Sequence, residues 1–170
     1  MLAGDPRAAE EELRRSFESL SRIGEVYNAS TIAARLAEAL YLQDRDDEAL
    51  AFSRKAEELA PEDDLWTQAA WRSVRAKVLA RNRQTEAEAL DLAREAVEML
   101  RATDAPVWRA DGLCDCAEVL EACGQTDEAR ELLAEALELL ERKGASVPAE
   151  RTRTRLSRLA ALSAAFLASG

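Results

Sequence analysis

The sequence repeats at an interval of 40 residues, and this periodicity constrains the fold more than any other feature. Small and apolar residues recur in one register across three successive units, and the pattern extends toward both ends. A repeat of this length holds a pair of helices, and one such pair cannot bury its apolar face alone. We therefore expect a single solenoid over residues 1–170. The recurring positions include Ala49, Ala89 and Ala129; Ala56, Ala96 and Ala136; Leu59, Met99 and Leu139; and Leu36, Ala76, Cys116 and Leu156.

The residue composition indicates that the repeats are helical. The chain contains 35 alanines and 24 leucines, while valine and isoleucine together number nine. Alanine and leucine lose little conformational freedom in a helix, whereas strands favour β-branched residues. We expect an all-α fold of about eight helices arranged as antiparallel hairpins.

Capping residues and helix breakers divide the chain at matching intervals. Asp5 with Pro6 opens the first helix and Gly24 ends it. The other expected boundaries are Asn28 or Ser30 to Gln43, Asp46 to Ala60, Asp63 or Asp64 to Asn82, Thr85 (with Glu88 as a capping box) to residue 103, Pro106 to Gly124, Thr126 to Gly144, and Pro148 to the C-terminus. These helices form a partial repeat at 5–24, repeats at 28–61, 63–103 and 106–144, and a capping helix at 148–169.

The charge balance disfavours several classes of partner. The net charge is -10, and an acidic chain repels phosphate backbones and anionic lipid headgroups. The longest apolar stretch, residues 159–168, is far shorter than the ~20 residues that a membrane-spanning helix needs. We therefore expect neither a nucleic-acid nor a membrane partner.

The sequence offers no recognisable catalytic machinery. Histidine is absent, which removes the commonest general base and the Ser–His and Cys–His nucleophile pairs. It also lacks a glycine-rich phosphate loop, a serine elbow and a carboxylate cluster with metal-binding spacing. We expect a non-enzymatic protein without a cofactor or metal.

Three cysteines, Cys114, Cys116 and Cys123, lie within one predicted helix. Residues two apart on a helix point about 200° away from each other, so Cys114 and Cys116 cannot ligate one metal. Three thiols without secretory spacing, and an N-terminus without a signal peptide, are typical of a cytoplasmic protein. We expect buried structural cysteines, with a redox or metal role as the alternative.

The stretch from Leu36 to Pro61 resembles a tetratricopeptide repeat. The family's first-helix small residue matches Ala37, its central alanine Ala49, its second-helix alanine Ala56, and its closing proline Pro61. The resemblance implies a right-handed superhelical solenoid that binds proteins. The 40-residue period exceeds the family's usual period of about 34, and the tyrosine and glycine of the first turn are absent. The later units match through Ala76, Leu79, Ala89, Ala93 and Ala96, and through Ala117, Leu120, Gly124, Ala129, Leu133 and Ala136.

A narrower resemblance covers nearly the whole chain. Segments 64–81, 93–97 and 138–144 are similar to the C-terminal repeats of large bacterial signalling proteins. In those proteins a nucleotide-binding ATPase domain, with an adenylate/guanylate cyclase-type or transcription-regulator domain, precedes the repeats. The resemblance implies a regulatory region and brings no catalytic residue. The first helix aligns with the second helix of a repeat, which favours a piece excised from a longer chain over a stand-alone adaptor.

The candidate binding surface is the concave side, which the first helix of each repeat lines in this family. Its third unit is acidic and its last helix basic, which favours a protein or peptide with a basic stretch, or another domain of the parent chain. The alternatives are a solvated charged face and a homodimerisation element that uses the end faces. Glu38 and Glu118 stand where a carboxylate clamp needs cationic or amide donors, which disfavours the binding of chaperone tails. The candidate residues are Glu38, Tyr41, Ser73, Lys77, Asp111, Glu118, Glu121 and Arg158.

The aromatic residues are expected mainly in the core. We expect Trp66, Trp71 and Trp108 to pack between adjacent hairpins, with Trp66 and Trp108 as partly exposed interface anchors in the alternative. Core or end-cap positions are expected for Phe17, Phe52 and Phe166. The arginines at 151, 153, 155 and 158 alternate around one helix and are expected to pair with glutamates.

Overall fold

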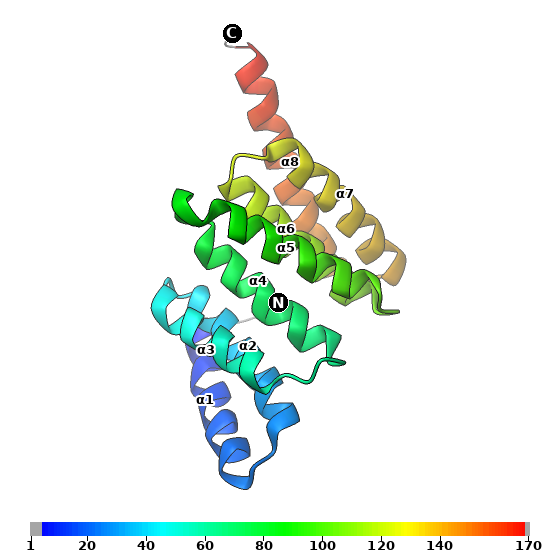
Figure 1. Ribbon diagram of the computed structural model, residues 1–170. Helices are drawn as coiled ribbons and strands as arrows, with labels where there is room; N and C mark the ends of the chain where they lie inside the picture. Colours follow the sequence, from blue (N-terminus) through cyan, green and yellow to red (C-terminus); the bar gives the residue numbers. More distant parts are fainter. Residues whose placement is uncertain (1–4, 169–170) are drawn as a thin grey trace.

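The computed structural model describes the backbone of residues 5–168 and the side chains of residues 5–161. Within these limits the chain is all-α, with one short 3₁₀ turn, η1 (Arg83–Thr85), and no strand. The helices run in order along the stack shown in Figure 1. Their bounds are α1 (Pro6–Ile23), α2 (Val26–Tyr41), α3 (Asp46–Leu59), α4 (Leu65–Leu79), α5 (Glu86–Arg101), α6 (Pro106–Ala122), α7 (Thr126–Lys143) and α8 (Ser146–Ala168).

Three antiparallel hairpins, α2–α3, α4–α5 and α6–α7, make the most extensive helix contacts. The second helix of each hairpin packs on the first helix of the next, and α1 packs on α2. The first helices also contact one another, α2 with α4 and α4 with α6. This stacking of hairpins confirms the predicted all-α solenoid (Figure 1).

The alanines that recur every 40 residues on the second helices are fully buried in the core. Ala49, Ala89 and Ala129 have no exposed surface, and Ala56, Ala96 and Ala136 have none either. Alanine lets two helix backbones approach, while leucine fills the space beside the crossing. The fully buried leucines on the facing helices α2 and α6 include Leu36, Leu40, Leu113 and Leu120.

Several helix ends follow the predicted capping chemistry. The Asp5 carboxylate accepts a hydrogen bond of 2.9 Å from the Arg7 amide, and Asp64 accepts one of 3.1 Å from the Thr67 amide. Gly24 and Gly144 end α1 and α7 with φ of 74°. This left-handed conformation carries no steric penalty for glycine.

Three predicted helix starts and one predicted capping box are wrong. The second helix begins before Asn28, because the Glu25 carboxylate accepts from the Asn28 amide (2.9 Å) and caps α2. Thr85 is the N-cap residue of α5, as predicted, but it does not form a capping box, since its hydroxyl donates to the Leu79 carbonyl oxygen (2.7 Å). Thr126 lies inside α7 and makes no cap bond. The last helix begins at Ser146, two residues before the predicted proline.

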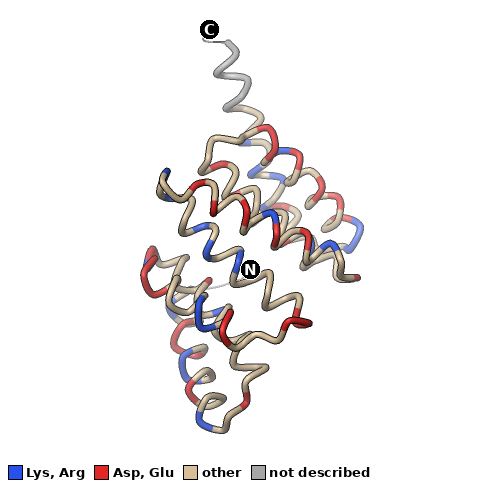
Figure 2. The backbone as a smooth tube through the Cα atoms, viewed as in Figure 1, with Lys and Arg blue, Asp and Glu red and all other residues tan. Residues whose placement is uncertain are grey.

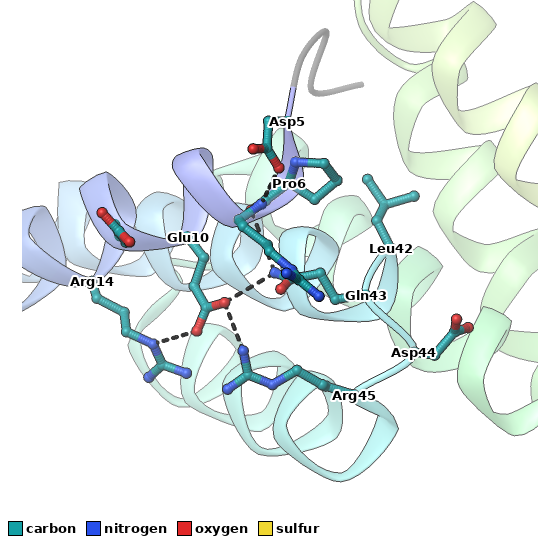
Figure 3. Close-up of a pocket in the computed structure, with 10 residues that line it drawn as sticks. Asp5, Pro6, Glu10, Arg14, Leu42, Gln43, Asp44 and Arg45 are labelled. Carbon is teal, nitrogen blue, oxygen red and sulfur yellow. Dashed lines mark hydrogen bonds and ion pairs between the residues drawn. The ribbon is translucent and has the colours of Figure 1, made fainter.

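A partly buried carboxylate attaches α1 to the turn between α2 and α3 (Figure 3). Glu10 accepts hydrogen bonds from Arg14 (2.8 Å), Gln43 (3.0 Å) and Arg45 (2.6 Å). Burial alone would raise the pKa of Glu10, but these three donors hold it below its usual value. The hollow drawn in Figure 3 is therefore spanned by interactions that hold the fold together.

Candidate functional site

All eight predicted site residues lie on the first helices. Glu38 and Tyr41 are on α2, and Ser73 and Lys77 are on α4. Asp111, Glu118 and Glu121 are on α6, and Arg158 is on α8. Because α2, α4 and α6 contact one another in sequence, these helices form one surface, which we call the first-helix face. Figure 2 shows acidic and basic residues along these helices, with α4 carrying basic residues only.

A buried lysine lies at the centre of this face. The Lys77 side chain is 3% exposed, and its Nζ lies 2.9 Å from Asp115 Oδ1. Nζ also lies 5.0 Å from the centroid of the Tyr41 ring, within cation–π range. Burial alone would lower the pKa of Lys77, but the negative charges of Asp115, Glu118 and Glu38 raise it. The ammonium is therefore held charged in a largely dehydrated environment.

Tyr41 connects α2 to α6 across α4. Its phenolic hydroxyl donates to Glu118 Oε1 at 2.5 Å. Burial, together with the Glu118 carboxylate, raises the pKa of Tyr41 to about 12. Arg81 covers the same ring, with its Cζ 4.5 Å from the centroid, and pairs with Asp46 (2.6 Å) and Asp44 (3.2 Å).

The acidic end of α6 is neutralised by the basic last helix. Glu121 pairs with Arg155 at 2.6 Å and with Arg158 at 2.9 Å. Arg155 also donates to the Cys114 carbonyl oxygen at 2.9 Å. Arg153 pairs with Glu141 and Glu150, so the predicted pairing of these arginines with glutamates is confirmed for 153, 155 and 158. The charges of Arg158 and Glu121 thus compensate each other within the chain.

A small hollow opens between α2, α4 and α6. Its volume is about 50 Å³. Three carboxylates and two tryptophans line it together with apolar side chains. The lining residues are Ala34, Glu38, Trp66, Ala70, Ser73, Val74, Leu100, Trp108, Asp111, Gly112 and Asp115.

Two tryptophans from adjacent hairpins meet beside this hollow. The ring centroids of Trp66 and Trp108 are 6.4 Å apart, with the planes tilted by 58°. Arg35 lies over Trp66, with its Cζ 4.9 Å from the ring centroid. The predicted packing between hairpins is confirmed for this pair, yet Trp108 remains 44% exposed. An exposed ring of this size, anchored by a second ring, is a surface feature enriched at protein interfaces.

Two of the carboxyl groups that line the hollow, those of Glu38 and Asp111, have raised pKa values. Burial raises the pKa of Glu38, and the nearby charges of Asp115 and Asp111 raise it further, while Lys77 lowers it. Burial likewise raises the pKa of Asp111. Groups that a fold retains at an energetic disadvantage are candidates for a functional role.

Gly112 brings α6 close to α5 at the wall of the hollow. A Cβ atom at this position would lie 2.5 Å from Leu100 Cδ1. Glycine is unfavourable inside a helix by about 1 kcal/mol relative to alanine. Its presence here lets Leu100 occupy the space that a side chain would fill.

Sequence reasoning missed Asp115 and Arg35 as members of this site. Asp115 is the ion-pair partner of Lys77, and it lies four residues after Asp111 and three before Glu118. That helical spacing places all three on one face and was the available signal. Nothing in the sequence indicated that Arg35 lies over Trp66.

The remaining aromatic predictions have mixed outcomes. Trp71 is buried against Ala33, Ala34 and Ala56, as expected for packing between hairpins. Phe17 and Phe52 meet edge to face, with ring centroids 5.7 Å apart, which confirms their packing role. The side chain of Phe166 lies outside the described residues.

Two of the three cysteines are buried, as predicted. Cys114 and Cys116 are buried, whereas Cys123 is partly exposed. Burial raises the pKa of Cys114, and it raises the pKa of Cys116 to about 11. Among the side chains of residues 5–161, no three Cys, Asp or Glu residues are grouped in a way that could hold a metal ion. None of the described helices is both long and apolar enough to cross a membrane.

Comparisons with known proteins give a similarity in architecture at low sequence identity. No family model and no curated protein matches the chain. Two crystal structures of a putative kinesin light chain with nearly identical TPR-like repeats, from Podospora anserina, are each 17% identical to it. Each match covers 95% of this chain and 99% of the other, with TM-scores of 0.48 and 0.47. The fold of this chain is therefore established by its own helix order and packing.

Proposed function

We propose that this chain is a non-enzymatic protein-interaction module that binds an extended peptide or a helix on its first-helix face. The observation that carries the proposal is the exposed ring of Trp108, packed on Trp66 beside a small hollow. Large aromatic residues of this kind supply most of the binding energy in many interfaces. Three carboxylates, those of Glu38, Asp111 and Asp115, line the hollow, which favours a partner segment with positive charge.

The ion pairs on this face refine the choice of binding residues. Glu118 is bonded to Tyr41, and Glu121 is bonded to Arg155 and Arg158. A partner that used these carboxylates would have to displace internal bonds. We therefore assign recognition to the part of the face between α2, α4 and the first half of α6, where Glu38 and Trp108 lie.

A peptide-binding assay tests the proposal. The purified chain is screened against an array of basic and acidic peptides, and the best binders are measured with the Trp108→Ala variant. We expect basic peptides to bind, and the variant to bind them at least about tenfold more weakly. Val147→Ala removes a more exposed apolar residue, on α8, and serves as the control, with affinity unchanged. Binding that is equal in all three proteins would contradict the assignment.

We further propose that the module is a cytoplasmic regulatory region of a larger bacterial signalling protein that carries an ATPase or cyclase-type domain. The support is the resemblance of segments 64–81, 93–97 and 138–144 to the repeats of such proteins. In this case the partner is a domain of the same parent chain. An immunoblot of source cells tests this: a species several times larger than 18.7 kDa is expected. A band at that mass would favour a stand-alone adaptor.

Homodimerisation is the second candidate, and one surface favours it. Ile23, Val26 and Tyr27 lie together at the turn between α1 and α2, and each is about half or more exposed. Clustered apolar residues of this size are typical of association surfaces. Sedimentation equilibrium over a range of concentrations decides the question, because a constant monomer mass excludes the dimer.

A further inference from the structure

We propose that the edge at which α2, α4 and α6 begin binds a proline-rich segment in the polyproline II conformation, with a basic residue beside its prolines. This inference rests on the proposed function, because it uses the exposed ring of Trp108 and names the class of segment that binds there. Three features of the described residues carry it: a row of exposed aromatic rings, two indole N–H groups without an acceptor, and unpaired carboxylates in the adjoining turns.

The aromatic row consists of Tyr27, Trp66 and Trp108. Each of them lies in the first turn of a first helix, on α2, α4 and α6 respectively. These helices run in the same direction and contact one another in sequence, so their starts follow each other along one edge of the stack (Figure 1). Tyr27 is 53% and Trp108 is 44% exposed, and Trp66 is partly exposed. Large rings left uncovered in one row are typical of an interaction surface.

The spacing of the row suits a polyproline II helix. The rings of Trp66 and Trp108 lean together, with centroids 6.4 Å apart and planes tilted by 58°, so the pair forms one contact for a proline ring. Packed helices lie about 8–10 Å apart, which sets the step from this pair to Tyr27 on α2. Polyproline II rises about 3.1 Å per residue with three residues per turn. A proline three positions along therefore lies about 9 Å away, where it contacts Tyr27.

The indole donors of the row favour an extended partner over a helical one. The Trp71 indole N–H donates to Gln68 Oε1 at 3.1 Å, whereas those of Trp66 and Trp108 find no acceptor in the part of the chain that the structure describes. A polyproline II backbone makes no internal hydrogen bond, so its carbonyl oxygens are available to these donors. An α-helix uses its carbonyl groups internally. Proline also brings no N–H that would need an acceptor on this edge.

The turns beside the row supply the charge complementarity. Glu62 and Asp63 precede α4, Asp104 precedes α6, and all three are exposed. Among the described residues, none of these three side chains takes part in an ion pair or a hydrogen bond. They outnumber Arg35, the cation that lies over Trp66. A basic residue next to the proline at the tryptophan pair would therefore be attracted to these carboxylates, and this attraction fixes the direction of the segment.

The test uses an acetylated peptide amide of one arginine followed by six prolines. It is titrated into the whole chain while the proton–nitrogen NMR spectrum is recorded. We expect the indole signals of Trp66 and Trp108 to shift saturably, while the signal of Trp71 stays fixed because that ring is buried. The control peptide has the same composition with prolines of alternating D and L configuration. It cannot form the left-handed helix and should bind at least about tenfold more weakly.

Variants of the row and of one turn assign the contacts. Trp108→Phe keeps an aromatic ring but loses the indole N–H, and should weaken binding about fivefold, the effect of one hydrogen bond. Tyr27→Ala removes the second contact and should weaken binding by at least about fivefold. Asp104→Asn should weaken binding of the arginine peptide about twofold and leave hexaproline without arginine unaffected. Glu131→Gln, at an exposed carboxylate on α7, is the matched control and should bind as the wild type does. Thermal melts establish that the variants are folded.

Several results would overturn the inference. The control peptide could bind as tightly as the all-L peptide, the Trp71 signal could shift with the other two, or both Trp108→Phe and Tyr27→Ala could leave the affinity unchanged. Loss of a dimer in Tyr27→Ala, without loss of peptide binding, would overturn it as well and assign this edge to a second copy of the chain. A failure of the proposed function is distinguishable, because then no peptide binds in a manner that depends on Trp108. If basic peptides bind through Trp108 without a preference for proline, the interaction module stands and the proline-rich partner is refuted.

Discussion

The Tyr41 hydroxyl donates a 2.5 Å hydrogen bond to the Glu118 carboxylate, although the two residues are 77 positions apart in the chain. Tyr41 is at the end of α2 and Glu118 is in α6, so the bond joins the first and third hairpins without passing through the second. Contacts in a solenoid are normally confined to neighbouring repeats. This bond therefore restrains the curvature of the first-helix face, and it pairs two polar side chains across that face.

Tyr41→Phe should destabilise the chain by about 1–2 kcal/mol, because the variant removes a hydrogen bond to a charged acceptor and leaves Glu118 without it. Urea unfolding followed by circular dichroism measures the change. Tyr27→Phe, an exposed tyrosine on the same helix, is the control and should change stability by less than about 0.5 kcal/mol. Equal stability of the two variants would show that the bond contributes nothing.

Burial of the Tyr41 hydroxyl, together with this bond, raises the pKa of Tyr41. Its pKa is raised to about 12, and a raised pKa in an acid means that the folded state favours the protonated form. The resulting stability is present at neutral pH and is lost as pH rises from the unfolded value of about 10 toward 12. Tyrosinate absorbance is expected to show a late step in the wild-type protein that disappears in Tyr41→Phe. A wild-type titration without this late step would contradict the prediction.

Lys77→Met should be among the most damaging single substitutions. It removes the buried ammonium that compensates Asp115, Glu118 and Glu38. Loss of one partner from a buried ion pair typically costs about 3–5 kcal/mol. Urea unfolding provides the measurement, and Lys55→Met, at an exposed lysine paired with Glu58, is the control. A loss no larger than that of the control would mean that the carboxylates do not depend on Lys77.

The sequence was sufficient for the architecture because the repeat, the caps and the alanine crossings are local signals. The alanines 40 residues apart are all buried, and Asp5, Gly24 and Asp64 occupy the helix ends that their chemistry favours. Glu25 was not identifiable as a cap, because glutamate is a weaker cap former than the asparagine three residues later.

The interactions of the site were less accessible from sequence. Helical register placed the eight candidate residues on the first helices, but it did not pair Tyr41 with Glu118 or Lys77 with Asp115. These pairs depend on how far each hairpin rotates relative to the one before. That rotation is set by side-chain packing, as at Gly112 and Leu100. The repeat period alone does not predict it.

Glu38→Gln should stabilise the chain. Burial and two neighbouring carboxylates raise the pKa of Glu38, so the folded state disfavours the charged form. The penalty is present above the unfolded pKa of about 4.3 and is relieved as pH falls and Glu38 is protonated. We expect the midpoint of thermal unfolding to rise by a few degrees at neutral pH and to be unchanged near pH 4. The same gain at both pH values would mean that charge is not the cause.

The three thiols should react at different rates. Cys123 is partly exposed, whereas Cys114 and Cys116 are buried, with the pKa of Cys116 raised to about 11. The thiolate is the reactive form, so burial and a raised pKa both slow modification. With Ellman's reagent at mildly alkaline pH, we expect one fast equivalent and two slow ones whose rate follows unfolding of the repeat. Cys123→Ser should abolish the fast phase and leave the slow phases as they were. As a control, all three thiols should react rapidly in denaturant. A fast phase that persists in the folded Cys123→Ser variant would show that α6 opens without global unfolding.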